Sequence, residues 1–143
     1  MTGETEARTG RLRVITRFTP PEGGSYEEKH AGNCSLLKPA ADEIRLCWKE
    51  TREGQRDDIE LHLKSGRAEM VRRGETCGHL RFAAGERLEG EYMTPYGALD
   101  RAVRTRSLLV TAAEDRGEVL LDYYLYVNCA LSNRARMELQ WRL

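Results

Sequence analysis

The stretch that decides the fold is MELQWRL, residues 137–143, at the carboxyl end of the chain. Its apolar residues Met137, Leu139, Trp141 and Leu143 occupy alternate positions, with polar residues between them. The run 119–127 keeps the same period of two. A period of two places one set of side chains on each face of a β-strand, which a helix cannot do. These stretches therefore predict strands with one buried and one solvated face.

The same alternation recurs between turn signals along the rest of the chain. Leu46 and Trp48 alternate with polar residues, and Ser65-Gly66 is typical of a tight hairpin turn. Turn signals about ten residues apart predict an antiparallel meander of about eight to eleven strands. The segment 98–103 fits one face of a helix as well as a strand, and the β-branched residues that follow it favour a strand.

A meander of this size must split into two sheets or close on itself, because unpaired strand edges invite aggregation. Local hairpins favour closure into a barrel over a sandwich with long crossings. We therefore expect an all-β protein with one barrel domain over residues 11–143, preceded by a polar, flexible segment at residues 1–10. The side chains expected inside the barrel are Leu46, Trp48, Leu61, Leu63, Phe82, Leu88, Tyr92, Tyr123, Leu125, Leu139 and Trp141.

Composition excludes several classes of function. Charged residues make up 32% of the chain and cancel to a net charge of zero, whereas nucleic-acid-binding proteins usually carry a basic excess. No apolar run approaches membrane-spanning length, and the amino terminus lacks the pattern of a secretory signal. We expect a cytoplasmic protein without nucleic-acid or membrane partners. The four cysteines lie far apart and form no C-x-x-C pair, so we expect free thiols, no metal and no cofactor.

Catalytic motifs are also missing from the sequence. No serine lies in a nucleophile elbow, and no glycine-rich loop precedes a helix that could hold phosphate. Of the three histidines, His62 is expected to face solvent, and the facing of His30 is left open. No inward histidine or lysine is expected that could hold a strongly anionic group of a ligand. Asp122 is expected on the outer face opposite an arginine. A protein without catalysis is therefore favoured, although an enzyme of a kind that the sequence does not reveal stays as an alternative.

Phe82 and Gly85, the run Tyr92–Leu99, Thr105 and the tyrosine-containing strand 119–127 together resemble the YwiB-like family. These are small, uncharacterised bacterial proteins. The resemblance extends over about residues 12–143 and is most specific between Phe82 and Thr105. It implies a calycin-type, lipocalin-like barrel, and it implies no activity.

Two functions follow from such a barrel. In the first, a small, mainly apolar ligand with one polar group binds inside, and the ligand-binding residues are Trp48, Tyr92 and Tyr123 on the wall with Thr94 and Tyr96 nearer the rim. In the second, the same rings fill the interior, and the protein is an interaction or assembly module without a ligand. The volume left inside the barrel discriminates between these two functions.

Overall fold

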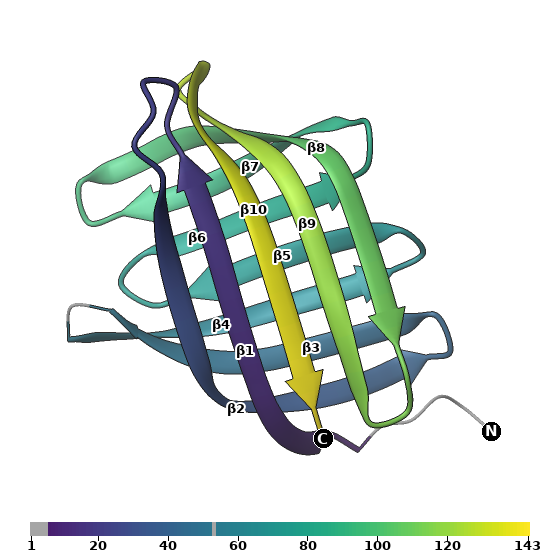
Figure 1. Ribbon diagram of the computed structural model, residues 1–143. Coiled ribbons are helices and arrows are strands. Elements are labelled where there is room, and N and C mark those ends of the chain that lie inside the picture. The colour runs from purple at the N-terminus through teal and green to yellow at the C-terminus, as the bar shows by residue number, and fades with distance from the viewer. Residues whose placement is uncertain (1–5, 53) are drawn as a thin grey trace.

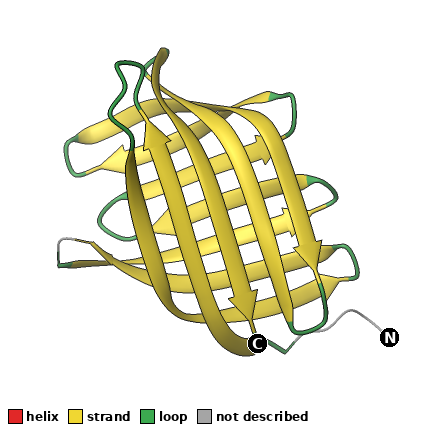
Figure 2. Ribbon diagram, viewed as in Figure 1, coloured by secondary structure: helices red, strands yellow, loops and turns green. Residues whose placement is uncertain are grey.

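The computed structural model describes residues 6–52 and 54–143, which form strands and loops throughout (Figure 2). The strands are β1 (Arg8–Thr19), β2 (Tyr26–Ala40), β3 (Glu43–Arg52), β4 (Gln55–Lys64), β5 (Arg67–Arg73), β6 (Cys77–Ala83), β7 (Arg87–Thr94), β8 (Gly97–Ala112), β9 (Arg116–Val127) and β10 (Ala130–Arg142). No helix long and apolar enough to cross a membrane occurs among these described residues.

Each strand pairs antiparallel with its neighbours in sequence, and β1 also pairs with β10, which closes the barrel. The expected meander, its closure and its number of strands are thereby confirmed. The segment 98–103, which also fitted a helix, lies within β8. Residues 1–5 of the expected flexible segment lie outside the described residues, whereas Arg8, Thr9 and Gly10 already pair with β2.

The barrel is flattened into two layers whose strands cross at a large angle (Figure 1). The long strands β2 and β8 bend from one layer into the other (Figure 1). In β8 the register shifts between Thr105 and Ser107, and such a bulge bends the strand that carries it. In β2 the register shifts between Leu37 and Ala40, next to Pro39, which has no backbone donor for the ladder.

The interior divides into two halves along the barrel axis. In one half, which we call the closed half, the inward side chains are apolar and almost fully buried. They are Leu12, Leu36, Leu46, Leu61, Leu63, Phe82, Val119, Leu139 and Trp141. We call the other half the open half. The hairpins that surround it connect β1 to β2, β3 to β4, β5 to β6, β7 to β8 and β9 to β10. Of the side chains expected inside, all are buried except Leu88 and Tyr92, which are partly exposed.

Candidate functional site

A cavity of about 540 Å³ occupies the open half of the barrel. Aromatic and aliphatic side chains share its lining with charged ones, so this lining is more polar than that of most small-molecule sites. The aromatic and aliphatic residues of the lining are Val14, Phe18, Trp48, Met70, Leu80, Tyr92, Tyr123, Leu125 and Met137. The charged and titratable residues of the lining are Glu28, Lys29, His30, Glu50, Arg72 and Arg101.

Neighbouring strands β3, β4 and β5 place a hydrogen-bonded network on one wall of the cavity. The Trp48 indole donates to Glu50 over 2.8 Å, and Arg72 donates to Glu50 over 3.2 Å and to Asp57 over 2.8 Å. Burial alone would lower the pKa of Arg72, but the two carboxylates outweigh burial and raise it. Arg72 is therefore a fixed cation whose charge two protein carboxylates already neutralise.

Arg101 on β8 is the second arginine of the cavity, and its surroundings differ. Its guanidinium carbon lies 4.4 Å from the centroid of the Tyr92 ring, which is a cation–π contact. Within the described part of the chain, no carboxylate forms an ion pair with Arg101. Burial lowers the pKa of Arg101, and the nearby charge of Arg72 lowers it further, although a guanidinium stays protonated.

Because Gly78 on β6 has no side chain, the side chains of Tyr92 and Arg101 can lie directly beside its backbone. A Cβ at Gly78 would lie 3.2 Å from Tyr92 Cδ2 and 3.4 Å from Arg101 Nη1, so any side chain there would crowd both groups. The register explains this arrangement, because Gly78 pairs directly with Tyr92 across β6 and β7. The glycine therefore helps to keep the cavity open beside the cation.

Tyr123 marks the boundary between the two halves. Its ring lines the cavity and also packs edge to face against Phe82, with ring centroids 4.9 Å apart. Phe82 is 1% exposed and belongs to the filled interior. Burial raises the pKa of Tyr123 to about 12, although Arg101 acts in the opposite direction. The phenol therefore stays protonated and can donate a hydrogen bond into the cavity.

The structure brings together three of the five expected ligand-binding residues. Trp48, Tyr92 and Tyr123 line the cavity, whereas Thr94 and Tyr96 do not. Thr94 Oγ1 instead accepts from the backbone N–H of Tyr96 and donates to the carbonyl of Gly97, which closes the tight turn between β7 and β8. Tyr96 at the tip of this turn is fully exposed. The turn thus lies at the expected end of the barrel but directs its side chains away from the cavity.

The expectation that no histidine faces the interior is wrong. His30 pairs with the inward residue Val14 across β1 and β2, and directly paired residues share a face of the sheet. His30 accordingly lines the cavity, with its Nε2 buried and without a hydrogen-bond partner in the described structure. His62 lies on the outer face, as expected, where it contacts Glu60.

Three further residues of the cavity were not expected from the sequence, namely Glu50, Arg72 and Arg101. A signal for them exists, because each continues an inward apolar series by one step of two residues. Glu50 follows Trp48, Arg72 follows Met70, and Arg101 precedes Val103. The period of two therefore extends from the closed half into the open half, while the residue type changes from apolar to charged.

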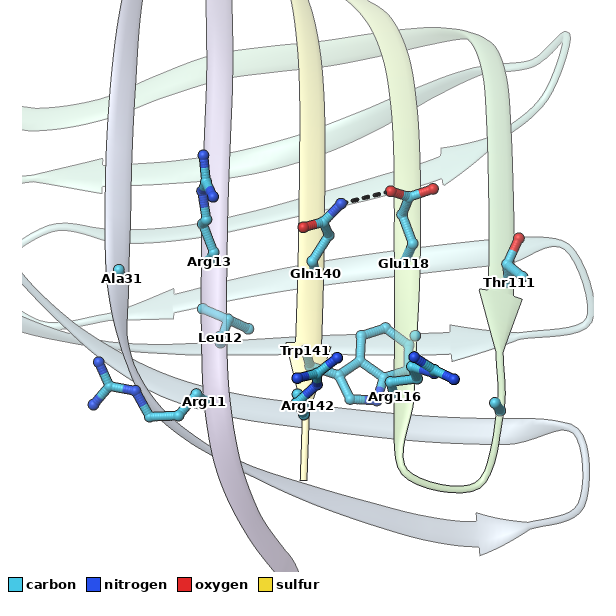
Figure 3. Close-up of a pocket in the computed structure, with 12 residues that line it drawn as sticks. Arg11, Leu12, Arg13, Ala31, Thr111, Arg116, Glu118, Gln140, Trp141 and Arg142 are labelled. Carbon is cyan, nitrogen blue, oxygen red and sulfur yellow. Dashed lines mark hydrogen bonds between the residues drawn. The ribbon is translucent and has the colours of Figure 1, made fainter.

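A second depression, of about 640 Å³, lies on the outer face of β1, β10 and β9 (Figure 3). Arg11 pairs with Arg142 and Arg142 pairs with Arg116, so three exposed arginines form a row across these strands. Gln140 donates to Glu118 over 2.8 Å above this row (Figure 3). Because long, exposed side chains form its walls, this groove is less preorganised than the interior cavity, and we take the cavity as the candidate site.

All four cysteines are free in the structure: Cys34 is buried, Cys47 is partly buried, and Cys77 and Cys129 are exposed. Among residues 6–52 and 54–143, no group of three or more histidine, cysteine, aspartate or glutamate side chains is placed to hold a metal ion.

Comparisons with known proteins agree with this architecture. The crystal structure of ywiB protein from Bacillus subtilis superposes with a TM-score of 0.87 at 15% sequence identity, covering 98% of this chain and 94% of that one. This similarity shows the fold. Comparison with curated proteins gives no match. The profile of the family described as a domain of unknown function, DUF1934, matches residues 15–139. The chain therefore belongs to the DUF1934 family.

Proposed function

We propose that this protein binds a small molecule in the open half of its barrel. The observation that carries the proposal is the cavity itself, because about 540 Å³ is within the range of sites that enclose small ligands. Trp48, Tyr92 and Tyr123 offer flat apolar surface to the body of the ligand. The ligand carries polar groups as well, since the lining of the cavity also presents Glu50, Arg72 and Arg101. It is thus more polar than the sequence alone suggested.

The alternative of a filled barrel that works through its outer surface fits only the closed half. There Leu46, Leu61 and Leu139 are completely buried by neighbouring side chains. In the open half, the buried Trp48 and Tyr123 face open space. This asymmetry supports a binding protein over a purely structural barrel.

Titration with N-phenyl-1-naphthylamine, a neutral dye that fluoresces in apolar surroundings, tests the proposal. Wild-type protein should bind one dye molecule with enhanced emission. Tyr92→Ala should weaken binding by about tenfold, because it removes part of the apolar wall. Tyr96→Ala is the matched control, since it truncates a fully exposed tyrosine on the adjoining turn and should leave affinity unchanged.

Circular dichroism and thermal melts establish that both variants are folded. Absence of dye binding to the folded wild type would overturn the proposal and favour the interaction module. Equal weakening by both substitutions would also contradict it, because the binding surface would then lie outside the barrel. Native mass spectrometry of protein purified from cells provides a second readout, in which a retained small mass supports the proposal.

A further inference from the structure

We infer that the natural ligand carries a carboxylate and that Arg101 binds this group beside Tyr92 and Tyr123. This inference rests on the proposed function and deepens it. It starts from the contrast between the two arginines of the cavity. Arg72 already donates to Glu50 and Asp57, whereas Arg101 makes a cation–π contact with an aromatic ring. A partly buried cation without a carboxylate is costly unless a ligand supplies the counter-charge.

The geometry around Arg101 suits a carboxylate. The Tyr92 ring covers one part of the guanidinium at 4.4 Å, and an arginine stacked on a ring keeps its N–H groups free for two parallel bonds to a carboxylate. Gly78 has no side chain that could cover Arg101 Nη1, which lies 3.4 Å from the position of a Cβ at this glycine. Tyr123 lines the same cavity as Arg101 and adds a neutral donor. A planar anion bound here would meet donors from β8 and β9.

The remaining charges of the cavity favour a single negative charge on the ligand. Glu50 on the opposite wall is a carboxylate that would repel additional negative charge, and Lys29 of the lining already pairs with Glu27 at 3.9 Å. Arg72 cannot offset this repulsion, since Glu50 and Asp57 already use its charge. A monocarboxylate with an apolar body therefore fits better than a phosphate monoester, which is close to a dianion at neutral pH.

Three probes of the same shape test the charge of the ligand on the wild-type protein. They are 1-naphthoate, its neutral amide 1-naphthamide, and 1-naphthyl phosphate, each measured by displacement of N-phenyl-1-naphthylamine and by calorimetry. A hydrogen bond to a charged group predicts that 1-naphthoate binds about 10- to 100-fold more tightly than 1-naphthamide. Equal binding of the two would overturn the inference, and tightest binding of the phosphate would overturn the assignment of a carboxylate.

Variants of Arg101 assign the effect to one residue. Arg101→Met should abolish the preference for 1-naphthoate over 1-naphthamide. Arg101→Lys should keep only part of this preference, because lysine lacks the planar guanidinium that can donate two parallel hydrogen bonds to a carboxylate. Arg104→Met is the matched control, since Arg104 is exposed on the same strand, and it should keep the full preference. An unchanged preference in Arg101→Met would contradict the inference.

The neutral dye separates the two proposals. Arg104→Met, on the outer face of β8, should bind N-phenyl-1-naphthylamine as the wild type does, because it changes no residue of the cavity. If the wild type binds this dye but shows no preference for 1-naphthoate, the inference fails and the binding function stands. If the wild type binds neither the dye nor any naphthyl probe, the binding function fails. The wild-type comparison decides the inference even if Arg101→Met does not fold.

Discussion

The closed and open halves of this barrel share strands, register and side-chain period, yet they differ in what they hold. In the closed half the inward residues are apolar and interlocked, as with Leu139 and Trp141. In the open half the same series continue with Glu50, Arg72 and Arg101 around a cavity. The difference teaches that a barrel can separate its two tasks along one axis. Apolar packing is concentrated in the filled half, and our proposal places ligand binding in the half where charged side chains replace part of that packing.

The largest effect should come from the closed half. Trp141 is 3% exposed and contributes to the buried interior, so Trp141→Ala should lower the free energy of unfolding by about 3–5 kcal/mol in urea melts. The neighbouring outward residue provides the control, because Gln140→Ala should cost less than about 1 kcal/mol. Equal destabilisation by the two substitutions would contradict the facing of β10.

Alanine substitutions at two glycines, Gly117 in the closed half and Gly78 in the open half, compare how tightly the two halves are packed. A Cβ at Gly117 would overlap the buried ring of Trp141, whereas a Cβ at Gly78 would only approach Tyr92 and Arg101 in the open half. Gly117→Ala should therefore cost about 1–3 kcal/mol through overpacking, and Gly78→Ala should cost clearly less. Thermal and urea melts measure both. If Gly78→Ala is the more damaging, the closed half is not the rigid one.

The ion network of the open half should behave differently from apolar packing. Arg72→Met leaves the Asp57 carboxylate, whose side chain is 7% exposed, without its cation, at a cost of about 1–3 kcal/mol. Adding Asp57→Asn should recover part of this loss, because the neutral amide no longer requires a counter-charge. A double-mutant cycle in urea reports the coupling. Additive losses would show that the pair does not act as a unit.

The outer face, which is common to both halves, should contribute least. Asp122 pairs with Arg134 at 2.8 Å, and hydrogen bonding to Arg134 lowers the pKa of the Asp122 carboxyl. A lowered pKa gives stability that is present above the ordinary aspartate range and is lost as the pH falls through the folded-state pKa. Asp122→Asn should therefore cost up to about 1 kcal/mol at neutral pH, and variant and wild type should converge in acid.

Melts of both proteins between pH 7 and pH 2 measure this convergence. Asp58→Asn is the control, because Asp58 is 65% exposed and reaches Lys49 only at 3.9 Å, and it should cost less at neutral pH. A difference between Asp122→Asn and wild type that stays constant down to pH 2 would show that the carboxylate is not the source of the stability.

The sequence was more informative about the closed half than about the open half. Alternation of apolar residues predicted the strands, the closure and the inward facing of Trp141, because burial of one face imposes that pattern. It also predicted Asp122 opposite an arginine on the outer face, which the contact with Arg134 confirms. The same period of two reaches Arg101, but the residue was not predicted to face inward, since a charged residue in a strand is normally assigned to solvent.

The two tryptophans also differ in how well their surroundings could be predicted. Both Trp48 and Trp141 were placed inside the barrel, and both are buried. The open space beside Trp48 depends on which distant residues face it, such as the glycine at position 78 and the arginines at positions 72 and 101. The period of two sets the facing of each residue, but the volume enclosed by ten strands depends on all of their side chains together.

Fluorine NMR of protein labelled with 5-fluorotryptophan tests the central claim most directly. The chain contains two tryptophans, Trp48 in the cavity and Trp141 in the closed half, so each half carries one reporter. Trp48→Phe assigns the two resonances. On titration with N-phenyl-1-naphthylamine, the Trp48 resonance should shift and saturate while the Trp141 resonance stays in place. A shift of Trp141 with Trp48 unchanged, or no shift of either at saturating dye, would contradict a binding site in the open half.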